Sequence, residues 1–115
     1  MEIEPIKSFE TDSLTAYVYG SQSDLSKAAA KEVNKYICDV IASQGSATAI
    51  LATGNSQIQF LKELLAISEI DWSKVTLFHM DEYLGLKGDH TASFRRYMRE
   101  RVEEKVHPGV FHYLK

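Results

Sequence analysis

The fold class follows from one stretch, Ala47-Thr48-Ala49-Ile50-Leu51-Ala52-Thr53-Gly54-Asn55-Ser56. Its first six residues lack the alternation of apolar and polar residues that marks a half-exposed strand. Such a run is typical of a strand covered on both faces, as in a parallel sheet. The four residues that follow suit a tight turn, and apolar residues at helical spacing come after them. We therefore predict a strand that leads through a short loop into a helix.

The same alternation of strands and helices extends in both directions from this unit. The predicted elements are a strand over 14–19, a helix around 25–41 that ends at Gly45, a strand over 47–52, a helix after Ser56, a strand over 75–80, a helix capped by Thr91 and a strand over 110–114. The order β-α-β-α-β-α-β implies a mostly parallel sheet with right-handed crossovers. We expect a three-layer, Rossmann-like α/β fold.

The domain organisation is simple, because no repeat, linker or second domain is visible in residues 1–115. We expect a single domain, and a partial one, because no helix follows the last predicted strand to cover it. An open doubly wound sheet normally has a helix there. A sheet edge used for pairing with another chain is an equally physical interpretation.

Composition excludes several classes of protein. The chain has 115 residues, of which 44% are hydrophobic and 25% charged, and these are ordinary globular values. The single cysteine, Cys38, excludes an internal disulfide and argues against a cysteine-based zinc site. The net charge is −3 and acids balance the basic residues locally, so we expect no nucleic-acid partner. Without a membrane-length apolar run or a signal-peptide pattern, we expect a soluble, cytoplasmic protein with no membrane partner.

The first candidate site is the loop Thr53-Gly54-Asn55-Ser56, at the carboxyl end of a predicted strand. In open α/β sheets ligands bind at this edge. Gly54 lets the backbone approach a ligand, and Ser56 can cap a helix whose free N–H groups and dipole favour an anion. The loop is therefore a plausible phosphate cradle. The alternative is that these residues serve only turn geometry and helix capping.

The second candidate site is Asp81-Glu82-Tyr83, at the end of the strand predicted over 75–80. Two carboxylates in this position could bind a metal, act as a general base, or bond backbone N–H groups of the loop. His79, inside the strand, is predicted to be a hydrogen-bonded core histidine. A solvated face is predicted for four arginines on the helix after Thr91, among which glutamates are interleaved: Arg95, Arg96, Arg99 and Arg101.

Taken together, three segments resemble the glucosamine-6-phosphate deaminase family, whose superfamily also includes 6-phosphogluconolactonases. They are Leu51–Gln57, Trp72–Leu86 and Asp89–Phe94. The most specific part is Met80-Asp81-Glu82-Tyr83-Leu84-Gly85-Leu86, combined with the preceding strand entry and the following His90-x-x-Ser93. The resemblance covers the chain from about residue 14 to residue 115, which corresponds to the first half of a family member.

The resemblance implies a Rossmann-like hydrolase of amino-sugar and carbohydrate metabolism. Family members convert glucosamine-6-phosphate and water to fructose-6-phosphate and ammonia, without a metal or organic cofactor. Asp81 matches the acid that moves a proton between C2 and C1 of the open-chain sugar. Thr53, Gly54, Asn55 and Ser56 match the loop that holds the phosphate. The expected partner is an amino-sugar phosphate, and the uncovered last strand leaves a homo-oligomer open.

Three alternatives stay open beside this interpretation. The family's ring-opening histidine matches no histidine here, so we expect the chain alone to have little or no deaminase activity and consider a non-catalytic sugar-phosphate-binding module. A 6-phosphogluconolactonase is a second alternative, although lactonases favour Asp-Glu-Arg where this chain has Tyr83. A phospho-acceptor receiver domain is the third, but its acidic pair after the first strand is missing, because only Asp24 is found there.

Overall fold

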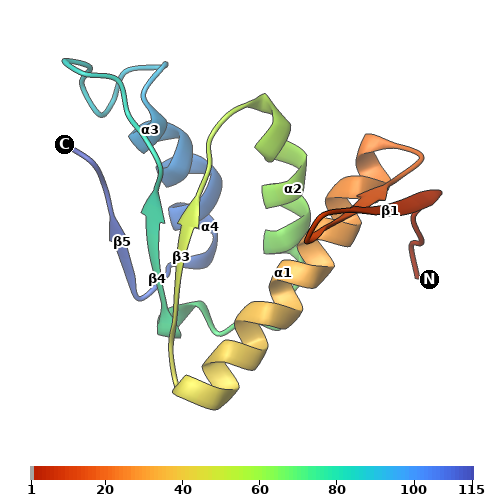
Figure 1. Ribbon diagram of the computed structural model, residues 1–115. Coiled ribbons are helices and arrows are strands. Elements are labelled where there is room, and N and C mark those ends of the chain that lie inside the picture. The colour runs from red at the N-terminus through yellow and green to blue at the C-terminus, as the bar shows by residue number, and fades with distance from the viewer. Residues whose placement is uncertain (1) are drawn as a thin grey trace.

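The computed structural model describes residues 2–115 and contains a parallel three-stranded sheet (Figure 1). The strands are β3 (Ala47–Leu51), β4 (Val75–His79) and β5 (Val110–His112), hydrogen-bonded in that order. The connections contain α2 (Asn55–Ala66), the short 3₁₀ helix η1 (Trp72–Lys74), α3 (Phe94–Met98), the π-helical η2 (Arg99–Glu103) and α4 (Glu104–Val106). The expected α/β class with a parallel sheet is confirmed.

The long helix α1 (Gln22–Gln44) precedes the sheet and is well defined at both ends. The hydroxyl of Ser21 accepts a hydrogen bond from the Asp24 amide at 3.1 Å, which satisfies one of the free N–H groups of the first turn. At the other end Gly45 adopts the left-handed conformation with φ 84° and donates its N–H to the Ile41 carbonyl. The predicted helix and its glycine cap are both confirmed.

The first predicted strand forms, but its predicted place in the parallel sheet is wrong. It is β2 (Leu14–Val18), and it pairs antiparallel with β1 (Lys7–Thr11), a strand that the sequence reading did not assign. A two-residue turn joins them, in which Asp12 has φ 53°. The hairpin lies beyond α1 and α2, away from the sheet (Figure 1). The strand β2 therefore pairs with β1, which is only two residues away in the chain, and not with the more distant β3.

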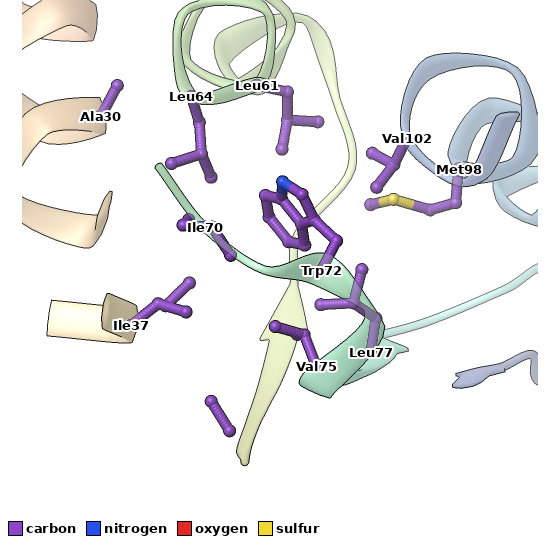
Figure 2. Close-up of a cluster of buried hydrophobic side chains, with 11 residues drawn as sticks. Ala30, Ile37, Leu61, Leu64, Ile70, Trp72, Val75, Leu77, Met98 and Val102 are labelled. Atoms are coloured by element: carbon purple, nitrogen blue, oxygen red, sulfur yellow. The ribbon is translucent and has the colours of Figure 1, made fainter. Parts of the chain in front are cut away.

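The hydrophobic core lies between one face of the sheet and the helices. Figure 2 shows Trp72, Val75 and Leu77 pointing toward Leu61 and Leu64 of α2 and toward Met98 and Val102. Leu77, Met98 and Val102 are fully buried. This packing explains why the helices run side by side on the same face of the sheet.

The opposite face of the sheet is open in the described residues. Its apolar side chains remain accessible, with Ile50 65% exposed and Val110 45% exposed. The ring of Phe78 stacks on that of His112, with 4.7 Å between centroids, and makes a small aromatic patch there. The described chain therefore supplies two of the three expected layers. Within residues 2–115, none of the helices combines the length and apolarity needed to cross a bilayer.

Candidate active site

The register of β3 against β4 brings the two candidate loops to one edge of the sheet. Leu51 pairs with His79, and the Met80 amide continues the ladder by donating to the Leu51 carbonyl at 3.2 Å. Thr53 and Asp81 each follow this pair by two residues, so both segments leave the sheet at its carboxyl edge (Figure 1). The structure thus brings together the two segments that the sequence singled out separately.

Gly54 begins helix α2 and needs its glycine for backbone reasons. Its φ of 119° and ψ of 167° are strained for any residue with a side chain. A Cβ added there would meet nothing within 4 Å, so the dihedral angle and not space selects glycine. The prediction that Ser56 caps the helix is wrong, because Gly54 is the N-cap and Ser56 already lies in the first turn. The Gln57 amide donates to the Gly54 carbonyl at 3.1 Å, whereas the amides of Asn55 and Ser56 precede the intrahelical bonds and remain suited to an anion.

Tyr97 of α3 holds this loop from the side. Its hydroxyl donates a hydrogen bond to the Gly54 carbonyl at 2.8 Å. Burial raises the pKa of the Tyr97 phenol, so the hydroxyl stays protonated as a donor. The sequence alone did not single out Tyr97 as a residue of the site. The hydrogen bond joins residues that are 43 positions apart in the chain, and a local sequence pattern does not predict such a contact.

Glu82 is the most heavily bonded side chain of the site. Its carboxylate accepts five hydrogen bonds, from the Tyr83, Phe94 and Arg95 amides, the Ser93 hydroxyl and the Arg95 Nε. The side chain is only 6% exposed. Burial alone would raise the pKa of this carboxyl, but the hydrogen bonds from Ser93 and the three amides outweigh it and hold the pKa far below its ordinary value.

Two sequence predictions near Glu82 are wrong for the same reason. Ser93 and not Thr91 is the N-cap of α3, and Ser93 also donates to Glu82 at 2.7 Å. Arg95 does not belong to a solvated face, because its side chain is 17% exposed and lies 2.9 Å from the Glu82 carboxylate. In both cases a carboxylate from a distant part of the chain attracts groups that a helix pattern alone would leave to solvent or to a local cap.

Asp81 lies one residue before Glu82, and a hydrogen bond from His79 fixes its backbone. The Leu114 amide donates to Nε2 of His79 at 3.0 Å, so Nδ1 carries the proton and donates to the Asp81 carbonyl at 2.9 Å. His79 is 4% exposed, and the prediction of a hydrogen-bonded core histidine is confirmed. The Asp81 side chain is exposed, and in residues 2–115 no hydrogen bond reaches its carboxylate. It is therefore free to contact a ligand.

A small cavity of about 230 Å³ opens beside the loop, between the start of α2 and α3. Gly54 and Asn55 line it, whereas Thr53, Ser56 and Asp81 do not. Arg96, Glu100 and Arg101 also line it, and Arg96 is paired with Glu100 at 2.9 Å, so Arg101 is the cation of this lining without an ion pair in residues 2–115. Together with the amides of the first turn, Arg101 makes this end of the sheet favourable to an anion. Across the described part of the chain, no three His, Cys, Asp or Glu side chains group as a metal site.

We predict that Glu82→Gln lowers the free energy of unfolding at pH 7 by about 3 kcal/mol, because it leaves buried donors without their charged acceptor. The folded pKa of Glu82 lies below its ordinary value of 4.5, so the carboxylate stabilises the fold fully above that pH. Its contribution is lost as the pH falls below 4.5 toward the folded pKa. Chemical denaturation of both proteins between pH 3 and pH 7 measures the difference.

The matched control is Glu100→Gln, since Glu100 forms an exposed ion pair with Arg96 at 2.9 Å. We expect it to change stability by at most about 0.5 kcal/mol. Equal effects of the two substitutions, or a difference between wild type and Glu82→Gln that grows toward pH 3, would contradict the role assigned to Glu82.

Comparison with known proteins agrees with this geometry. The family model for glucosamine-6-phosphate isomerases/6-phosphogluconolactonase matches residues 20–115. A glucosamine-6-phosphate deaminase of Streptococcus pneumoniae serotype 4 is 43% identical over 58 residues, which are 50% of this chain and 24% of that protein. The deaminase of Streptococcus pneumoniae strain 70585 matches to the same extent. The matched segment thus spans about a quarter of these curated relatives.

Solved structures show the same fold. A 6-phosphogluconolactonase from Shewanella baltica superimposes with a TM-score of 0.76 at 23% identity, over 84% of this chain and 41% of that one. A monomeric glucosamine-6-phosphate deaminase gives a TM-score of 0.67 at 23% identity, over 81% of this chain and 39% of that one. At this identity the structures establish the fold, and the family match covers most of the sequence. The chain belongs to the glucosamine-6-phosphate isomerase/6-phosphogluconolactonase family.

Proposed function

We propose that this chain carries the phosphate loop and the proton-transferring carboxylate of a glucosamine-6-phosphate deaminase. The observation that carries the proposal is the register of β3 and β4, which sets the loop at residues 53–56 beside Asp81 at one sheet edge. The loop offers unpaired amides at a helix N-terminus, and Asp81 offers an exposed carboxylate. An anionic sugar bound at the loop would therefore place its carbon chain within reach of a base.

The roles divide as the chemistry requires. The amides of Asn55 and Ser56, with the hydroxyl of Thr53, would hold the phosphate, and Gly54 would let the backbone come close to it. The Asp81 carboxylate would take the proton from C2 of the open-chain sugar and return it to C1, which converts the aldose to the ketose form. Glu82 would act as a positioning residue, because it fixes the backbone next to Asp81.

A 6-phosphogluconolactonase is the second candidate, since such enzymes are among the matched structures. Its substrate, like that of the deaminase, would be a sugar phosphate, so the loop at residues 53–56 would serve either reaction. Tyr83 stands where lactonases favour arginine, and we therefore place the deaminase first. A sugar-phosphate-binding module without turnover would use the same loop, and the measurements below distinguish the three.

We predict that the 115-residue chain binds glucosamine-6-phosphate saturably in isothermal titration calorimetry and that Gly54→Ala weakens binding about tenfold. A side chain at φ 119° costs about 1–3 kcal/mol, which the loop would relieve by leaving its anion-binding shape. Gly20→Ala is the control, because its Cβ would meet only Ile6 at an ordinary 3.7 Å. Absence of binding, or equal weakening by both substitutions, would refute the phosphate loop.

Turnover separates the three functions. We predict little or no ammonia release from glucosamine-6-phosphate by this chain. The reason is that none of its histidines matches the histidine that opens the sugar ring in the deaminase family that the chain resembles. Release that disappears in Asp81→Asn would overturn this expectation and place the whole reaction within residues 1–115. Hydrolysis of 6-phosphogluconolactone above background would instead favour the lactonase.

A further inference from the structure

A second cavity, of about 480 Å³, lies between α2 and the segment formed by η2 and α4. The two helical segments run side by side, since Tyr97 reaches Gly54 and both Ile58 and Arg101 line this cavity as well as the smaller one beside the loop. The cavity is therefore a groove that continues from the candidate site toward the far ends of the helices. We call it the interhelical groove.

The walls of the interhelical groove combine an apolar floor with positive charge. The floor comes from α2, whose Ile58, Leu61, Leu65 and Ala66 recur at helical spacing. The remaining lining residues are three cations, Lys62, Arg101 and Lys105. No carboxylate is among the lining residues, although the chain as a whole carries a net charge of −3.

These three cations have no counter-charge in the part of the chain that the structure describes. The ion pairs found in residues 2–115 involve other basic residues: Lys31, Lys35, Lys74, Arg95 and Arg96. Arg101 is held in place by Tyr97, whose ring centroid lies 4.4 Å from the guanidinium carbon. Three like charges around an apolar floor repel one another, and an anion with an apolar body would relieve that repulsion while covering the floor.

We propose that the interhelical groove binds a small amphiphilic anion, that is, a carboxylate, sulfate or phosphate attached to an aliphatic or aromatic body. The apolar body lies against Ile58 and Leu65, and the anionic group contacts Lys62, Arg101 and Lys105. The volume of about 480 Å³ falls in the range of small-molecule pockets. The interhelical groove adjoins the cavity beside the sugar-phosphate loop and shares Ile58 and Arg101 with it, but the proposal does not depend on the proposed deaminase function.

The test is calorimetric titration of the full 115-residue chain with decanoate below its micelle-forming concentration. Decanoate is expected to bind saturably with a stoichiometry near one. Inorganic phosphate, which has the charge without the apolar body, and decanol, which has the body without the charge, are both expected to bind at least about tenfold more weakly. Decanol that matches decanoate would show that the cations play no part and would overturn the proposal.

Variants locate the site. Lys62→Gln combined with Lys105→Gln is expected to weaken decanoate binding about fivefold, as loss of two solvent-accessible ion pairs would. Lys27→Gln combined with Lys87→Gln removes the same charge elsewhere and is expected to leave binding unchanged. Ala66→Glu, at an exposed position of the groove, adds a repelling carboxylate and is expected to weaken binding at least as much.

Circular dichroism of each variant confirms that the fold is kept. Equal loss in both lysine pairs would show only a general charge effect and would overturn the assignment. Binding unaffected by the groove substitutions would place decanoate elsewhere, with the same consequence.

Discussion

The buried carboxylate of Glu82 is the interaction on which the candidate site depends. It accepts hydrogen bonds from Ser93, Phe94 and Arg95, residues eleven to thirteen positions further along the chain. These bonds fix the beginning of α3, and α3 carries Tyr97 to the Gly54 carbonyl. One acidic side chain at the end of β4 thereby determines where the loop after β3 is held. A carboxylate with so many donors tolerates no uncharged substitute without leaving some of them unsatisfied.

The two candidate loops are stabilised by different physics. Gly54 and its neighbours depend on backbone geometry, a positive φ and the free amides of α2. Asp81 depends on the residues on either side of it. His79 donates a hydrogen bond to the Asp81 carbonyl, and the Glu82 carboxylate accepts one from the Tyr83 amide. The Asp81 side chain is left out of these networks. The proton transfer proposed for Asp81 needs that freedom, whereas the residues that place Asp81 do not.

Much of the fold could be predicted from local patterns, but little of the site geometry could. Apolar spacing and the Gly45 cap predicted α1, and the apolar run at 47–52 predicted β3. The hairpin of β1 and β2 was missed because the sequence favours strand formation at 14–18 without saying which partner it takes. Glu82, Ser93 and Arg95 meet only after the chain has folded, so a helix pattern assigned Arg95 to solvent and the cap to Thr91. The resemblance pointed to Asp81 and to residues 53–56, and their roles stay predictions.

The most direct measurement follows the backbone amides of the ¹⁵N-labelled chain by NMR during titration with glucosamine-6-phosphate. If the loops after β3 and β4 form one sugar-phosphate site, the amides of Gly54, Asn55 and Ser56 and those of Asp81 and Glu82 will shift together with a single dissociation constant. Shifts confined to one of the two loops, or found instead around Lys62 and Lys105, would contradict a shared site at this edge of the sheet.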